Sequence, residues 1–408
     1  MPSPTVQIAF DLSANGIGNF FTLDDATKGD LDDAVYTLGG DLLQDVTSYT
    51  RTITIRRGRS RSLQRFTAAA ATITLDNRTR RFDPLAGTAL TPYAGQILPR
   101  KQVAVSVAGV PIFTGQVEDW NLAYELSGDS IAEAVCADGF AIIAQDTLAG
   151  SATTSQAPGA RIGDVLNQLG WPVAQRSINT GQATLIADTI PADANGLQYL
   201  QKIEASEPGA LFVNRSGLMT FRDRSATQVW GGVTFADDGT GIPYQGIDVL
   251  YGTEELYTGA FVTRTNGTAT VGTATATDAT AVAAYGTNSL TIDTLLSSDT
   301  QAQDLANWLV GKYKDPTYRV NGLQVILEGV TATQAGLVLG LELADVVKVV
   351  YTPNRLGSAI TQFVVVDGIE HQITPNAHQV KLTLSATDLA FVLDSDQFGV
   401  LDSNILGF

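Results

Sequence analysis

The sequence predicts a β-rich multidomain protein of the α+β class. In this fold, two β-barrel or β-sandwich domains flank a small α/β domain, and a C-terminal extension follows. Apolar and polar residues alternate in the first and last thirds of the chain, whereas residues 160–206 have the spacing of helices. The chain is rich in Thr, Val, Ala and Gly and only 16% charged, which favours folded strands over disorder.

The first domain is expected at residues 1–148. Its apolar residues recur at every second position, the period of strands with one buried face. These residues are Val6, Ile8 and Phe10; Ile53 and Ile55; Ile73 and Leu75; and Val103, Val105 and Val107. Ala108-Gly109 lies between two apolar runs and predicts a tight hairpin. We therefore expect a small antiparallel sandwich or barrel.

The small α/β domain is expected at residues 149–228. The stretch 148–160 is small, polar and contains proline, which is typical of a linker. A first helix is predicted from apolar residues that share one face: Ile162, Val165, Leu166 and Leu169. Gly170 ends this helix, Asn195 caps a second one, and Ser216-Gly217 forms the turn of a hairpin.

The second β-barrel-like domain is expected at residues 229–390. It includes one helix at 298–314, where Ser298 and Gln301 resemble a capping box. Three alternating strands follow, at 344–352, 361–371 and 378–388.

The last segment, 391–408, is too short to form a core of its own, so we expect it to pack on a body or a partner. Leu-Asp at 393–394 recurs at 401–402. The residues predicted to dock are Leu393, Phe398, Leu401, Leu406 and Phe408.

No motif for catalysis, cofactor binding or a metal site is found in the sequence, so we expect a protein that is not an enzyme. Cys136, the single cysteine, is expected to be a small buried apolar residue. His371 and His378 supply too few ligands for zinc and are expected to be surface or hydrogen-bonded residues. The acidic run 24–33 is interpreted as a solvated loop, with a hard cation as the alternative.

The formal net charge of −17 disfavours binding of the whole protein to nucleic acid, because such binding depends on neutralising phosphates. No secretory signal and no membrane-spanning apolar run is visible, which predicts synthesis in a cytosol and no stable membrane insertion. One segment departs from the acidic balance. Residues 51–66, RTITIRRGRSRSLQRF, contain six arginines.

Several stretches resemble one known family. They are ATITLDNRTRRFDPLAG with TPYAGQILPRKQVAV, LQYLQKIEASEPGALFVNRSGLMTFRDR, AYGTNSLTIDTLLSSDTQAQDLANWL and FVLDSDQFGVLDSNILGF. In this order they are similar to the minor tail proteins of long, non-contractile-tailed bacteriophages, the tail-tip (baseplate) hub family. One departure is Thr79-Arg80, where many relatives have Asp-Gly, and it puts the local turn in question.

The resemblance implies a virion protein at the tail tip, made in the bacterial host. In the family, three subunits form a ring that closes the tail tube below the hexameric ring of the distal tail protein. The implied partners are a second and third copy of the chain, the distal tail ring, the tape measure protein and other minor tail or fibre proteins. Phage DNA passes only in transit, and no cofactor is implied. The alternatives are the hexameric distal tail ring itself, and a receptor-binding or cell-wall-degrading tip protein.

Three interpretations compete for the arginine segment. A DNA grip is disfavoured by the acidic chain and by the lack of interleaved aromatic residues. A solvated strand edge that prevents edge pairing is a common alternative. The favoured hypothesis is an inter-subunit surface in which Arg56, Arg57, Arg59 and Arg61 face carboxylates of a neighbouring chain.

Overall fold

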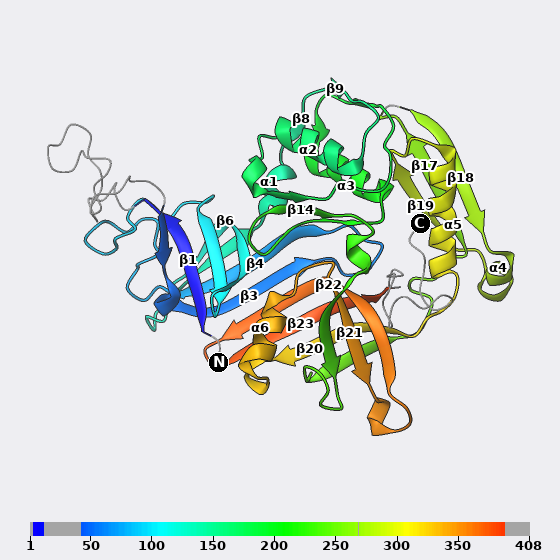
Figure 1. The fold of residues 1–408 in the computed structure, drawn as a ribbon. Coiled ribbons are helices and arrows are strands. Elements are labelled where there is room, and N and C mark those ends of the chain that lie inside the picture. The colour runs from blue at the N-terminus through cyan, green and yellow to red at the C-terminus, as the bar shows by residue number, and fades with distance from the viewer. Residues whose placement is uncertain (1–2, 12–41, 268, 388–408) are drawn as a thin grey trace.

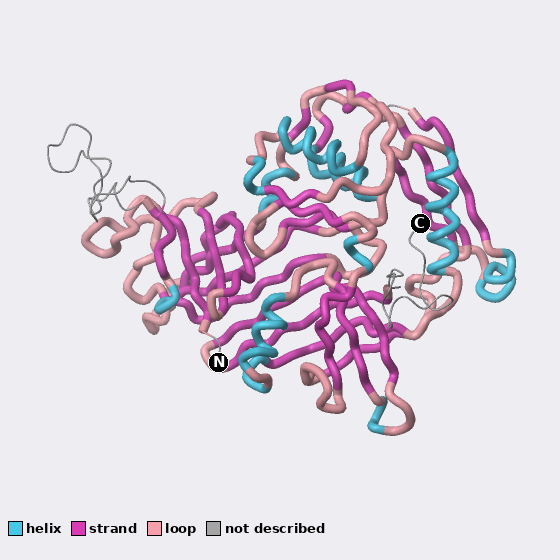
Figure 2. Tube along the Cα trace, viewed as in Figure 1, coloured by secondary structure: helices cyan, strands magenta, loops and turns pink. Residues whose placement is uncertain are grey.

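The computed structural model describes residues 3–11, 42–267 and 269–387. The predicted docking segment 391–408 and the acidic run 24–33 lie outside these residues. The β-rich multidomain fold predicted from the sequence is confirmed (Figures 1 and 2). Four parts are distinguished below: a first β-unit, a middle unit, a second β-unit and an inserted unit within the second β-unit.

The first β-unit contains seven strands joined by antiparallel pairing. They are β1 (Pro4–Phe10), β2 (Leu42–Asp45), β3 (Thr50–Gly58), β4 (Thr67–Asp76), β5 (Gln102–Val107), β6 (Val110–Ala123) and β7 (Ile131–Ala137). The alternating apolar residues are buried, as predicted. Ala108 and Gly109, with φ of 51° and 80°, form the tight turn between β5 and β6, because two positive φ angles match the twist of the flanking strands.

The second β-unit contains six strands and one helix. They are β15 (Trp230–Ala236), β16 (Gly246–Leu250), β20 (Arg319–Ile326), α6 (Ala332–Gly340), β21 (Val346–Tyr351), β22 (Ile360–Thr374) and β23 (Ala377–Ala386). The last three strands are those predicted from the sequence. Helix α6 was not predicted, although Thr331 and Gln334 form a capping box at its start.

Both β-units belong to one sheet, because β3 pairs with β4 on one side and with β22 on the other. The strand order is β16-β20-β23-β22-β3-β4-β7-β6-β5-β1-β2, and β15 and β21 join it beside β22. Among the described strands this path is open, so two separately closed barrels are not observed. The physical reason is that β3 pairs with β22 along the edge that it would need to close the first β-unit into a barrel (Figure 1).

The middle unit covers β3 and β4 from one side of the sheet (Figure 1). It contains α1 (Gly139–Ile143), β8 (Thr147–Leu148), β9 (Ser151–Ala152), α2 (Pro158–Gln168), β10 (Arg176–Ile178), β11 (Thr189–Ile190), β12 (Ala194–Asn195), α3 (Gly196–Ser206), β13 (Ala210–Val213) and β14 (Met219–Arg222). The side chain of Asn195 accepts a hydrogen bond from the N–H of Gln198 at 3.0 Å, which confirms the predicted cap of α3. The stretch 148–160 is not a free linker: β9 pairs with β11, and Leu148 is buried.

The inserted unit lies between β16 and β20 in the sequence. It contains β17 (Gly259–Thr265), β18 (Thr270–Thr277), α4 (Ala279–Tyr285), β19 (Ser289–Thr294) and α5 (Asp299–Tyr313). The predicted helix at 298–314 is α5, and the Ser298 hydroxyl accepts a hydrogen bond from the N–H of Gln301 at 3.2 Å. Its apolar face packs on β17 and β18 and forms a second, separate core. None of the helices in the described ranges has the length and apolar character needed to cross a membrane.

Gly58 allows the backbone of β3 to approach that of β22 closely. It lies opposite Gly368, its φ is +110°, and a Cβ atom built on it would lie 2.1 Å from the carbonyl oxygen of Asp367. We predict that Gly58→Ala lowers the free energy of unfolding by about 3 kcal/mol or more, because backbone strain and a backbone clash add. Urea unfolding followed by circular dichroism measures this loss.

The control for this prediction is Gly87→Ala, where a Cβ atom meets nothing within 4 Å. Its effect should stay within about 0.5 kcal/mol. Equal stability of the two variants would show that the close approach at Gly58 carries no strain.

Candidate functional site

The arginine segment 51–66 lies on β3 and on the loop that follows it, where all four parts of the molecule meet (Figure 1). Each of its six arginines contacts an oxygen of the same chain. Arg51 pairs with Asp129 at 2.6 Å, Arg56 with Glu370 at 3.2 Å, Arg57 with Glu342, Arg59 with Asp367 at 2.9 Å, Arg61 with Glu254 at 2.5 Å, and Arg65 donates to the amide oxygen of Gln201 at 3.4 Å.

Arg57 and Glu342 form a buried ion pair at the centre of this junction, and the Arg57 side chain is 3% exposed. Arg57 also donates to the carbonyl of Val213 in β13, at 3.3 Å. The other carboxylate oxygen of Glu342 accepts from the backbone N–H of Arg215 at 2.9 Å. A buried charge is tolerated only when it is paired and hydrogen-bonded. This pair therefore fixes the first β-unit, the middle unit and the second β-unit against one another.

Arg59 forms the second internal contact. Its Nε donates to Asp367, whose carboxylate is completely buried, and its guanidinium lies 4.5 Å from the ring centre of Phe66. The backbone N–H of Arg59 also donates to the Asp367 carbonyl at 2.8 Å. These contacts extend the β3–β22 pairing into the loop after β3.

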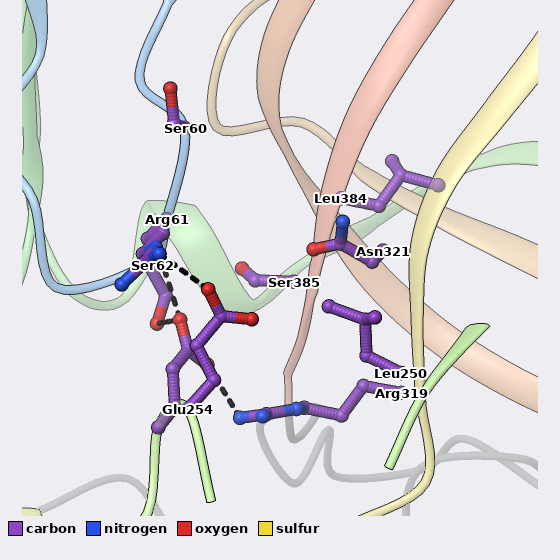
Figure 3. A pocket seen from close by; sticks show the side chains of 10 residues that line it. Ser60, Arg61, Ser62, Leu250, Glu254, Arg319, Asn321, Leu384 and Ser385 are labelled. Atoms are coloured by element: carbon purple, nitrogen blue, oxygen red, sulfur yellow. Dashed lines mark hydrogen bonds and ion pairs between the residues drawn. The ribbon is translucent and has the colours of Figure 1, made fainter. Parts of the chain in front are cut away.

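Arg61 and Ser62 attach this loop to the chain just before the inserted unit. Arg61 pairs with Glu254, and the Ser62 hydroxyl donates to Glu255, which also pairs with Arg319 at 2.7 Å (Figure 3). The pocket between these side chains has a volume of about 60 Å³. Such a volume holds only a few water molecules. The arrangement is a polar joint between two segments, and it is too small for an organic ligand.

The four arginines of the interface hypothesis differ in exposure. Arg57 and Arg59 are turned into the molecule and pair with carboxylates of their own chain. The side chains of Arg56 and Arg61 are 70% and 52% exposed, so these two still offer guanidinium surface to another chain. The density of arginines in the sequence could not reveal this difference, because Glu342 and Asp367 lie about three hundred residues further along the chain.

Arg57 should be far more important for stability than its neighbour Arg56. Arg57→Ala leaves Glu342 buried without its cation, and we predict a loss of about 3 to 5 kcal/mol in the free energy of unfolding. Arg56→Ala removes an exposed pair and should cost less than about 1 kcal/mol. Urea unfolding of both variants checks this order, and similar losses would contradict the proposed role of the buried pair.

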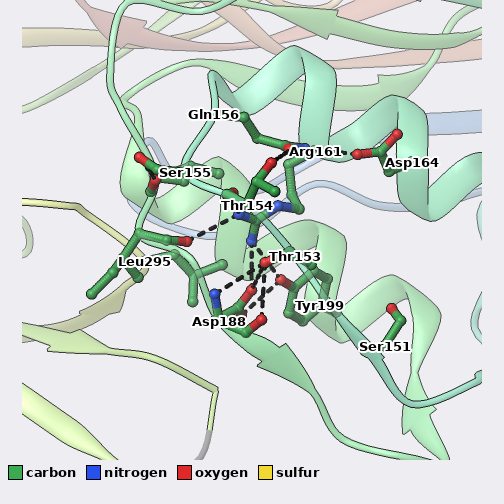
Figure 4. A network of polar contacts seen from close by, with 12 residues as sticks. Ser151, Thr153, Thr154, Ser155, Gln156, Arg161, Asp164, Asp188, Tyr199 and Leu295 are labelled. Carbon is green, nitrogen blue, oxygen red and sulfur yellow. Dashed lines mark hydrogen bonds and ion pairs between the residues drawn. The ribbon is translucent and has the colours of Figure 1, made fainter.

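A second buried network holds the middle unit together and was not predicted from the sequence (Figure 4). Arg161 on α2 is fully buried and donates to Asp188 at 2.7 Å and to the Tyr199 hydroxyl at 2.9 Å. The Tyr199 hydroxyl donates to the other oxygen of Asp188 at 2.8 Å, and burial raises the pKa of Tyr199. Arg161 also donates to the carbonyls of Thr154 and Ile186. The network ties the predicted linker to both helices.

The two histidines lie on β22 and β23 and are buried, so the expectation of surface residues was wrong and that of hydrogen-bonded residues is confirmed. The Nδ1 atom of His371 lies 3.0 Å from the Nε2 atom of His378. Burial lowers the pKa of both, that of His378 to about 4, so both are neutral at pH 7. Within residues 3–11, 42–267 and 269–387, no group of three or more potential metal ligands is found.

Cys136 is fully buried on β7, as predicted. Burial raises the pKa of its thiol to about 12. The thiolate, which is the reactive form, is therefore almost absent at neutral pH.

A larger groove, of about 380 Å³, lies between the loop 59–65, α3, β19 and α5. Glu204 of α3 lines it; this residue is 7% exposed, and its carboxylate accepts a hydrogen bond from the N–H of Leu211 at 2.9 Å. Burial raises the pKa of Glu204 to about 7, although this N–H and the nearby charges of Arg59 and Arg65 act in the opposite direction.

Stability should therefore fall as the pH rises through the folded-state pKa of Glu204. Because that pKa lies above the ordinary value of 4.5, protonation favours the folded state, and the gain is lost between about pH 5 and pH 8. Between pH 5 and pH 8, we predict that the free energy of unfolding falls by about 2 kcal/mol less in Glu204→Gln than in the wild type. Urea unfolding at the two pH values gives the difference.

Asp138, whose pKa burial also raises to about 7, serves as an internal reference because it is present in both proteins. Parallel pH profiles of the wild type and Glu204→Gln would exclude Glu204 as the source of the dependence.

No protein-family model and no curated protein matches this sequence. Solved structures do match the fold. The tail protein from Neisseria meningitidis MC58 is similar with a TM-score of 0.58 at 10% identity, over 94% of this chain and 96% of that chain. The 43 kDa tail protein of prophage MuSo2 from Shewanella oneidensis is similar with a TM-score of 0.56 at 11% identity, over 95% of this chain and 97% of that chain. This chain therefore has the fold of these tail proteins over nearly its whole length.

Proposed function

We propose that the protein is a structural component of a bacteriophage virion and forms the central hub of the tail tip. Three copies form a ring that closes the tail tube below the distal tail ring. The ring seats the tape measure protein, anchors tip proteins or fibres, and opens for DNA ejection. The observation that carries this proposal is the similarity of fold to two tail proteins, which extends over more than nine tenths of each chain.

The architecture supports this role. Each chain contains two β-units joined in one sheet, so three chains present six β-units to a six-fold ring. The buried Arg57–Glu342 pair and the shared sheet fix the units against one another, as a ring that holds back a packaged genome requires. The acidic chain repels DNA, which favours passage over binding. We propose a purely structural role without catalysis.

The exposed arginines remain candidates for the contact between chains. Arg56 and Arg61 each form an ion pair with a carboxylate of their own chain, yet more than half of each side chain is open to solvent. The planar guanidinium group can bind a second carboxylate through its remaining N–H groups. A permanent ring interface of about 2,000 Å² or more is large enough to include both residues.

We predict that the double variant Arg56→Ala and Arg61→Ala assembles complete tails about ten-fold less efficiently, because contacts at the centre of an interface dominate its free energy. Complete tails are counted by electron microscopy of phage lysates. The matched control is Arg78→Ala, which removes a 61% exposed arginine paired with Asp76 outside the segment. If the double variant gave complete tails at the wild-type yield, Arg56 and Arg61 would be excluded as contacts between chains.

The proposal as a whole is tested by cryo-electron microscopy of intact virions. Three copies of this chain in a ring at the tail tip, below a six-fold ring, are expected. Six copies would identify the chain as the distal tail ring, and absence from the particle would overturn the virion role. Specific cleavage of peptidoglycan by the purified protein would instead support a cell-wall-degrading tip protein.

A further inference from the structure

The groove of about 380 Å³ is enclosed by parts of the chain that are distant in sequence. Residues of the loop 59–65, of α3, and of β19 and α5 in the inserted unit line it, and the second β-unit contributes Ala344 and Val365. The strand β23 ends in the groove, and Ala386 and Thr387, the last residues of the described chain, line it. The described chain therefore ends at the groove.

The inserted unit contributes several apolar side chains to the groove. Leu290 and Ile292 of β19 and Trp308 of α5 are half-buried against the core of that unit, and each lines the groove. Leu63, in the loop after β3, packs on the same core and lines the groove too. Apolar side chains arranged in this way bind an apolar segment more favourably than water.

The polar groups of the groove favour an anionic segment. Arg65 and Lys312 line the groove, and neither forms an ion pair within the described residues; Arg59 lines it as well but is already paired with Asp367. The two glutamates that line it already accept hydrogen bonds from backbone N–H groups: Glu204 from Leu211, and Glu207 from Gln182 and Ala183. Asp293 adds one exposed carboxylate. Carboxylates of an incoming segment would therefore meet mainly guanidinium and ammonium groups.

We propose that residues 388–408 of this same chain bind in the groove. The segment contains four aspartates, no lysine or arginine, and ten large apolar residues, so it matches both the apolar side chains and the cations of the groove. Its first apolar run has Leu389, Phe391 and Leu393 at alternating positions, which lie on one face of an extended chain. Residues 388–393 span about 20 Å when extended, so this run reaches the groove directly from Thr387.

The binding of this segment would join all four parts of the molecule, because residues of the first β-unit, the middle unit, the second β-unit and the inserted unit line the groove. It does not depend on the hub role. A virion protein and a protein of any other function would show the same contact, so the two proposals fail separately.

Hydrogen exchange of the full-length chain, read by mass spectrometry, tests the proposal. In the double variant Phe391→Asp and Leu393→Asp, peptides covering residues 201–210 and 305–313 should exchange about ten-fold faster or more, because two buried apolar side chains are lost. The matched control Ser395→Asp and Ser403→Asp adds the same charge without removing apolar groups and should leave these peptides protected.

The groove side is tested by Lys312→Glu, which should speed exchange in the same peptides. Its control is Lys348→Glu, a half-buried lysine on β21 that does not line the groove. Unchanged exchange in both the tail variant and Lys312→Glu would overturn the proposal. Protection that increases with protein concentration would overturn it as well, since it would show that the segment binds a second copy of the chain.

Discussion

The backbone pairing of β3 with β22 is the constraint on which the rest of the structure depends. It joins residues more than three hundred positions apart and merges two β-units into one open sheet. The close approach is made at Gly58 and Gly368, and it places Arg56 directly opposite Glu370. From this strand Arg57 reaches Val213 of the middle unit and Glu342 of the second β-unit. Positions of three units are therefore set by one strand and its side chains.

The charges of the chain are distributed in a way that its net charge conceals. The acidic excess gives −17 overall, yet five of the six arginines of residues 51–66 pair with carboxylates of the same molecule. Arg57 and Arg59 act in the interior, where an unpaired charge would be strongly unfavourable. Arg56 and Arg61 lie at the surface, where an ion pair contributes little to stability and can be shared with a partner. One segment thus serves internal cohesion and, in the proposed ring, external contact.

The groove of about 380 Å³ and the point where the four parts of the molecule meet both depend on the loop after β3. The loop that follows β3 carries Arg59 to Asp367, Arg61 to Glu254 and Arg65 to Gln201. In doing so it lines the groove into which β23 ends. A C-terminal segment bound there would attach the inserted unit, whose core is separate, to the body of the molecule. Rigidity of this kind would suit a subunit of the proposed ring.

The sequence alone determined the local structure. Alternation of apolar residues located β1, β3, β4, β5 and the last three strands, and Asn195, Gly170 and Ser298 marked helix ends, because these signals act over a few residues. It did not reveal α6, which is only nine residues long and carries an exposed Leu337 beside its buried residues, or the Arg161 network, in which Arg161 and Tyr199 are 38 residues apart. Only the tertiary structure decided that the strands form one open sheet and that Arg57 and Arg59 point inward, because strand partners and carboxylate partners are brought together by long-range packing.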